Sequence, residues 1–146
     1  MAYNTILLDD QTKDQSFHGE AIANAAITPG HLIEYMSTGK VRVHATAGGD
    51  ALRMFALEDE LQGKEISAAY TAATQCQFAI VPHGGKVYAR VKSGESIAIG
   101  DKLQSAGDGT LSEFTASSAG VVEHPECIVG VALAASTGGL CAIRAM

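Results

Sequence analysis

The chain has 146 residues, of which 47% are hydrophobic and only 5% aromatic, and its formal net charge is -6. A chain of this length most economically forms one domain with a core of its own, and without tryptophan small aliphatic side chains must fill that core. The acidic balance lacks the positive footprint of a nucleic-acid binder, so we expect no nucleic-acid partner.

No stretch of the sequence has the form of a secretion signal or a membrane span. Residues 1–10 contain no basic region and only a short apolar run, whereas a signal peptide needs both. The longest apolar stretch, 127–135, is about half a membrane span and is interrupted by Gly130. We therefore expect a soluble protein, synthesised in the cytoplasm, with no membrane partner.

Residues 1–27 differ in character from the rest of the chain. The segment is acidic, it is polar over 11–19, and it shows no sustained hydrophobic period. We interpret it as an extended N-terminal arm of loose intrinsic structure that can order against a neighbour. A strand over 5–8 followed by a loop explains the same composition equally well. Residues 28–146 then form the β domain.

The β pattern begins with a turn of sequence TPG at 28–30, where proline presets one φ angle and glycine accepts a positive one. Residues 31–36 and 40–45 predict two strands of a hairpin, and 51–58 predict a third strand. Apolar side chains then recur at helical spacing between residues 59 and 73, which predicts a short helix or helical loop.

Two further hairpins are predicted along the rest of the chain. Residues 75–82 alternate between apolar and polar side chains, and Pro82 ends this strand because it has no N–H for the ladder. Residues 86–91 follow across a glycine turn, so we expect them to pair with it. At the C-terminus, an apolar run over 127–134 and a closing strand over 140–145 predict the other hairpin.

One pattern occurs twice. The sequence PGHLIE at 29–34, followed by GKV at 39–41, parallels IGDKLQ at 99–104, followed by GTL at 109–111. The spacing between the glycines is the same, and Ile33 and Leu103 occupy the same position. We interpret the two stretches as similar hairpins on related parts of one barrel, although shared turn chemistry also produces such similarity.

Residues able to carry chemistry are present but do not form a recognisable site. The histidines make no H-x-x-x-H or H-x-H pair, so we expect no metal site. We interpret Cys76, Cys127 and Cys141 as small buried hydrophobic residues, neither disulfide-bonded nor nucleophilic. The run Glu58-Asp59-Glu60 is typical of a solvated turn. We expect neither an enzyme nor a bound cofactor.

Several turns and strand edges together resemble a known family, the capsid decoration (cement) proteins of tailed bacteriophages. The stretches that carry the resemblance are PGHLIE at 29–34, ALEDELQGK at 56–64, VYA at 87–89, GESIAIGDKL at 94–103 and GDGTL at 107–111. The resemblance covers about residues 28–145 and leaves out the N-terminal arm. Its motifs are less specific than a metal-binding or nucleotide-binding signature.

The resemblance implies a structural virion protein on the outer surface of the expanded phage head. Proteins of this family commonly sit as homotrimers at three-fold and quasi-three-fold positions, where they clamp neighbouring major capsid protein subunits against the pressure of packaged DNA. A ring of copies repeats each weak contact and so strengthens attachment. The apolar residues of the arm, Tyr3, Ile6, Leu7 and Leu8, are the candidate capsid contacts.

The expected fold is mainly β: a single compact β-sandwich or barrel, β-tulip-like, with one short helix and an extended N-terminal arm. A ligand-binding or glycan-binding β domain on a virion or cell surface is the alternative function, although few aromatic residues are available for stacking on sugars. A carrier domain modified on lysine is a third possibility, but Lys92 and Lys102 do not sit convincingly at the tip of a tight hairpin.

Overall fold

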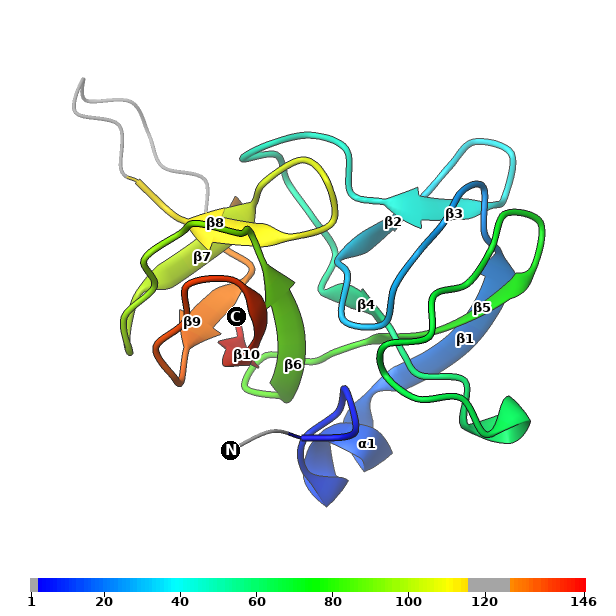
Figure 1. Cartoon of the computed structure of the whole chain (residues 1–146), viewed down its shortest axis with the longest axis horizontal. Helices are drawn as coiled ribbons and strands as arrows, with labels where there is room; N and C mark the ends of the chain where they lie inside the picture. The colour runs from blue at the N-terminus through cyan, green and yellow to red at the C-terminus, as the bar shows by residue number, and fades with distance from the viewer. Residues whose placement is uncertain (1–2, 116–126) are drawn as a thin grey trace.

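The computed structural model of the chain describes residues 3–115 and 127–146, and β-strands carry the fold (Figure 1). The helical elements are the α-helix α1 (Asp10–Gln15) and the 3-10 helix η1 (Glu60–Gln62). The first five strands are β1 (Phe17–Ile22), β2 (Ile33–Tyr35), β3 (Val41–Val43), β4 (Met54–Ala56) and β5 (Gln75–Ile80). The second five are β6 (Lys86–Val91), β7 (Lys102–Ser105), β8 (Leu111–Glu113), β9 (Gly130–Ala132) and β10 (Gly139–Ala145). This confirms the predicted mainly β fold.

Strands β6 to β10 form a closed barrel in the order β10-β6-β8-β7-β9. Strand β6 alternates between half-buried and buried side chains, so that Val87, Ala89 and Val91 point into the core. Leu103 and Leu111 from the β7–β8 hairpin complete that core, and both are fully buried. The barrel thus removes the open edges that an isolated sheet would leave.

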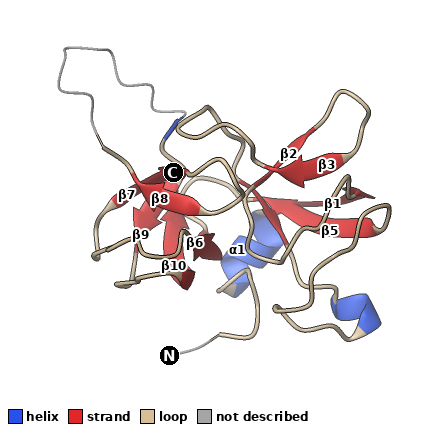
Figure 2. Ribbon diagram, turned by 45° about the horizontal axis from the view of Figure 1, so that its top comes forward, coloured by secondary structure: helices blue, strands red, loops and turns tan. Residues whose placement is uncertain are grey.

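Strands β1 to β5 make an open version of the same barrel. A three-stranded sheet, β1-β5-β4, lies beside the two-stranded hairpin β2-β3. Single bridges, Ala23 with Val41 and Leu32 with Phe55, connect the two sheets. These strands enclose a separate core that includes Ile33. They lie on the opposite side of the molecule from the closed barrel (Figures 1 and 2).

The two halves repeat the same pairing scheme. In the hairpin of the first half Ile33 lies opposite Val43. In the hairpin of the second half Leu103 lies opposite Glu113, and each of these residues is 70 positions after its equivalent. Five other pairs in the first half have an equivalent pair in the second. Given as first half with second half, they are Ala21–Cys76 with Ala89–Cys141, Ala23–Val41 with Val91–Leu111, Leu32–Phe55 with Lys102–Val131, Ala56–Phe78 with Ala132–Ile143, and Ile27–Tyr70 with Ile97–Ser136. The predicted similarity of the two hairpins is therefore confirmed, but each hairpin belongs to its own half.

The structure corrects the expectation of a loose N-terminal arm for residues 3–22. This segment contributes a bridge to β6 through Leu7, the helix α1, and strand β1, which pairs with β5. Asp9 caps α1 by accepting a hydrogen bond from the Thr12 backbone N–H at 2.7 Å. The hydrophobic pattern of β1 is weak because it is an edge strand, and at Gly19 the ring of Phe78 occupies the space of a side chain.

Two other local predictions need correction. The short helix or helical loop expected within 59–73 is present as the three-residue η1, but residues 66–73, whose spacing predicted it, are not helical, and the α-helix lies at Asp10–Gln15. Strands β5 and β6 do not pair, because β5 joins β1 and β4 while β6 joins the closed barrel. The chain between them crosses from one half to the other. The predicted C-terminal hairpin is confirmed as β9 and β10.

Candidate interaction surface

The four predicted contact residues lie on one short extended segment, but they face in different directions. Ile6 is fully buried and Leu7 is 4% exposed, and both belong to the larger hydrophobic core. Tyr3 is 42% exposed, with its ring edge-to-face on Tyr88 at 5.2 Å between ring centroids. Leu8 is half-buried. Only Tyr3 and Leu8 therefore present side chains to a partner.

Backbone hydrogen bonds hold this segment against β6. The N–H of Tyr88 donates to the Ile6 carbonyl at 2.7 Å, and the N–H of Leu8 donates to the Lys86 carbonyl at 3.1 Å. Strand β6 pairs with β8 only at Val91, so its earlier edge is free for the segment. The segment therefore acts as a short additional strand of the second half.

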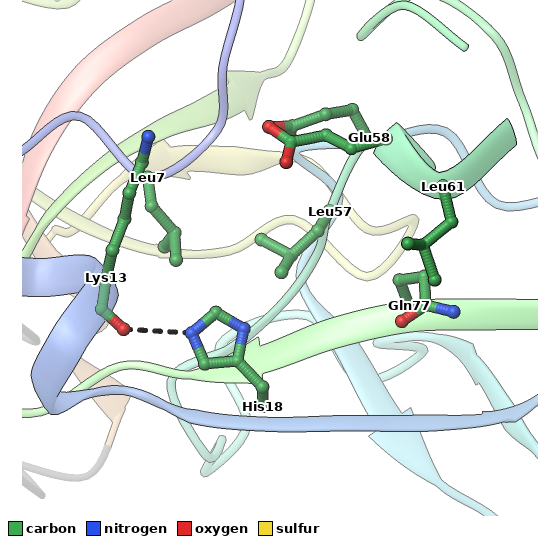
Figure 3. Close-up of a pocket in the computed structure, with 8 residues that line it drawn as sticks. Leu7, Lys13, His18, Leu57, Glu58, Leu61 and Gln77 are labelled. Carbon is green, nitrogen blue, oxygen red and sulfur yellow. Dashed lines mark hydrogen bonds between the residues drawn. The ribbon is translucent and has the colours of Figure 1, made fainter. Parts of the chain in front are cut away.

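A pocket of about 230 Å³ lies where the N-terminal segment, α1, β1, β5 and η1 meet (Figure 3). Its lining residues are Leu7, Lys13, His18, Leu57, Glu58, Glu60, Leu61 and Gln77. Nε2 of the His18 ring lies 2.9 Å from the Lys13 carbonyl oxygen, so this nitrogen carries the hydrogen. Leu61 is 87% exposed, which makes the η1 side of the pocket accessible and apolar.

Glu58 joins this pocket to the N-terminal segment. Its Oε2 atom accepts a hydrogen bond from the Ile6 backbone N–H at 3.1 Å. Burial raises the pKa of the Glu58 carboxyl, and the nearby Glu60 carboxylate raises it further. Glu58 is half-buried, so the sequence-based picture of a wholly solvated acidic turn is wrong at this residue.

Two larger hollows adjoin the pocket. One, of about 600 Å³, extends from Tyr3 and Glu58 to the loop after η1, as far as Ile66. The other, of about 580 Å³, extends from Tyr3 and Leu8 to Leu133 and the start of β10. Tyr3 lines both hollows, and Glu58 lines both the pocket and the first hollow, so the pocket and the two hollows together are here named the N-terminal face. It combines exposed or half-buried apolar residues with carboxylates and with basic side chains such as Lys64, Lys86 and Arg144, a chemistry that suits a protein partner.

A buried serine, a buried histidine and a half-buried glutamate lie together elsewhere in the molecule. Nδ1 of His44 is 2.7 Å from Oγ of Ser105, and Nε2 of His44 is 3.6 Å from Oε2 of Glu34. Nε2 of His44 also lies 3.0 Å from the Asp50 carbonyl oxygen and so carries the ring hydrogen, which in the neutral ring leaves Nδ1 to accept from the Ser105 hydroxyl. Ser105 has no exposed surface and cannot meet a substrate. The group joins the two halves, and no sequence motif connects residues so far apart.

Cys76 and Cys141 are free thiols. Cys76 and Cys141 are buried, as predicted, whereas Cys127 is half-buried. Burial raises the pKa of the Cys76 thiol to about 12 and also raises that of Cys141, so both stay protonated at neutral pH. Among residues 3–115 and 127–146, no three metal-ligating side chains converge. No helix there is long and apolar enough to cross a bilayer.

Comparison with known proteins gives a structural likeness. No family model matches the sequence, and no curated protein matches it. The structure is similar to the head fiber gp8.5 N base of bacteriophage phi29, with a TM-score of 0.58 and 16% sequence identity. The match covers 90% of this chain and 95% of the other. At this identity the likeness shows that the two chains share a fold.

Proposed function

We propose that this chain is a structural protein of a phage virion that binds the outer surface of the expanded head. The observation that carries the proposal is the likeness to the phi29 head fiber base, which extends over nearly the whole of both chains. The sequence resemblance to capsid decoration proteins supports the same location. A shared fold does not by itself determine function, so the contact surface must carry the rest of the argument.

The proposed partner is the major capsid protein, bound through the N-terminal face. Tyr3 and Leu8 supply apolar contacts on one side of this face, and Leu61 supplies another on η1. Ile6 and Leu7 act indirectly, because their burial fixes the segment that presents Tyr3 and Leu8. A preorganised segment loses less conformational entropy on binding than a loose arm would.

The finer part of the proposal is a homotrimer at the three-fold and quasi-three-fold positions that clamps neighbouring capsid subunits. Several weak copies of one contact, held in a ring, bind far more strongly than one copy alone. The shell is thereby stabilised against the pressure of packaged DNA. In this role the protein is synthesised in the host cytoplasm, has no catalytic activity and contacts neither nucleic acid nor membrane.

Co-sedimentation tests the proposal. The purified chain is mixed with expanded and unexpanded heads assembled from the major capsid protein of the same genome, and the heads are pelleted. We expect the chain to pellet with expanded heads only. Binding to neither form would overturn the proposed function, and equal binding to both would overturn the preference for expanded heads.

A pair of matched variants tests the surface. Tyr3→Ala is expected to weaken head binding by about tenfold, in line with the loss of one aromatic contact at an interface. Phe17→Ala removes another exposed aromatic ring, outside the hollows of the N-terminal face, and should bind normally. Deleting residues 1–20 is a poor test, because it would also remove Ile6 and Leu7 from the core.

A further inference from the structure

The two halves of the chain are joined by a contact between a turn of the second half and residues of the first half. The equivalent turn of the first half and the equivalent residues of the second half have no such contact with each other. Within the molecule, the turn between β7 and β8 packs on the side of the first half. The Leu32 N–H donates to the Gly109 carbonyl at 2.8 Å, and the Gly109 N–H donates to the His44 carbonyl at 3.2 Å. A Cβ atom at Gly109 would lie 2.8 Å from Cβ of Val43. The contact is therefore close-packed.

Strand β6 completes this contact. The Arg90 backbone N–H donates to the Gly30 carbonyl at 3.0 Å, and the Arg90 Nε donates to the Pro29 carbonyl at 2.8 Å. A Cβ atom at Gly30 would lie 3.0 Å from the Tyr88 carbonyl oxygen. The residues of the first half that make this contact, 29–32 together with 43 and 44, are here named its flank. Strand β6 and the β7–β8 turn of the second half cover this flank.

The equivalent turn of the first half, between β2 and β3, and the equivalent flank of the second half are both uncovered. Gly39 is equivalent to Gly109 and Gly100 to Gly30, yet a Cβ atom at Gly39 or Gly100 would have none of the described residues within 4 Å. Ser105 has no exposed surface, whereas its equivalent Tyr35 is 51% exposed. In Figure 1 the turn between β2 and β3 lies away from the closed barrel, while the turn between β7 and β8 lies towards the first half.

Exposed apolar side chains occur on both of these surfaces. Tyr35 belongs to the free turn surface, which also comprises Gly39 and Lys40. The free flank comprises residues 99–102 together with 113 and 114, and there Ile99 is 72% exposed, whereas its equivalent Pro29 is buried. Both side chains stand at positions whose equivalents are covered within the molecule, so a second copy that repeats this contact would bury them.

We propose that the free turn surface of one copy packs on the free flank of a second copy, repeating between chains the contact that joins the two halves. This proposal supplies an interface for the self-association that the proposed function includes. Because the two surfaces differ, the contact is head-to-tail and generates a closed ring or an open filament, according to the rotation between copies. A ring of this kind would alternate first and second halves around its axis.

Charge complementarity supports the choice of a second copy as the occupant. Within the molecule, His31 and Thr110 line the same hollow between the halves. Lys40 is equivalent to Thr110, and Asp101 is equivalent to His31. Glu113, which is exposed, takes the place of Val43. The contact between copies would therefore bring Lys40 of one chain beside Asp101 and Glu113 of the next. Lys102, which takes the place of Leu32, lies on the same flank, so the flank carries two carboxylates against one ammonium group and stays complementary to Lys40.

Charge reversal tests this interface in the full chain without heads, by sedimentation velocity. The wild-type protein is expected to associate, and Lys40→Glu or Glu113→Lys should each raise the dissociation constant by about tenfold. The double variant should recover association in part, since it restores one opposite-charge pair while Asp101 still repels the new glutamate. Asp14→Lys and Lys64→Glu change net charge in the same two senses at exposed positions elsewhere and should associate normally.

The outcomes separate this proposal from the proposed function. A monomeric wild-type chain, unchanged association of both single variants, or a double variant no better than either single variant would overturn the head-to-tail interface. Thermal unfolding of each variant establishes that it is folded. If association follows the expected pattern but the chain does not pellet with heads, the interface stands and the virion role fails.

Discussion

The two halves share one strand order, yet only the second closes into a barrel. In the second half β7 pairs with β9 at two positions, whereas in the first half a single bridge between Leu32 and Phe55 takes that place. The connection between β4 and β5 spans 57–74 and contains η1, whereas the equivalent connection between β9 and β10 spans only 133–138. The comparison teaches that the second half carries the regular scaffold, while the first half carries much of the N-terminal face.

The largest expected effect comes from matched truncations in the two cores. Leu103→Ala and its equivalent Ile33→Ala each remove a fully buried side chain, which should cost about 2–5 kcal/mol of the free energy of unfolding. Chemical denaturation followed by circular dichroism measures both. A single shared transition in both variants means that the halves unfold together, and two separate transitions would mean that they are independent.

The next effect isolates the packing between the halves. Gly39 and Gly109 have φ angles of 83° and 86°, so alanine at either position incurs about 1 kcal/mol or more of backbone strain. Only at Gly109 does the new Cβ also meet Val43, which should add about 1–3 kcal/mol. Equal destabilisation by Gly39→Ala and Gly109→Ala in urea unfolding would contradict the close packing of this contact.

A smaller effect concerns the N-terminal segment. Tyr3→Ala removes the edge-to-face contact with Tyr88 and should lower the free energy of unfolding by about 0.5–1.5 kcal/mol. The variant should still be fully folded at the temperature of the pelleting assay, so a tenfold loss of head binding under these conditions identifies Tyr3 as a contact residue. Thermal unfolding and pelleting of the same preparation give both values, and normal head binding by the folded variant would make Tyr3 purely structural.

The smallest effect is a pH dependence at Glu58. Because the pKa of this carboxyl is raised in the folded state, the folded chain binds more protons than the unfolded chain between the unfolded and the folded pKa. Stability from this group therefore falls as the pH rises through that window above the usual glutamate range. Glu58→Gln should flatten this part of the profile of unfolding free energy against pH, and an unchanged profile would rule Glu58 out as its source.

The sequence predicts the strand-rich fold and the repeated hairpins, because turn glycines and alternating apolar residues are local signals. It does not predict the helix at Asp10–Gln15, whose polar residues show no apolar face. It also misplaces Ile6 and Leu7 as free contacts, because their burial depends on the distant edge of β6. The pairing of β5 with β1 rather than β6 likewise depends on contacts that no local pattern encodes.

The equivalent positions of Cys76 and Cys141 give each half a reporter of its own opening. Both thiols are buried and free, on β5 and β10, and each lies opposite an alanine of the neighbouring strand. A thiol-reactive reagent can modify either cysteine only when its own half opens to solvent. With Cys127 replaced by serine, the labelling rates of Cys76 and Cys141 compare the local unfolding of the first and second halves within one protein.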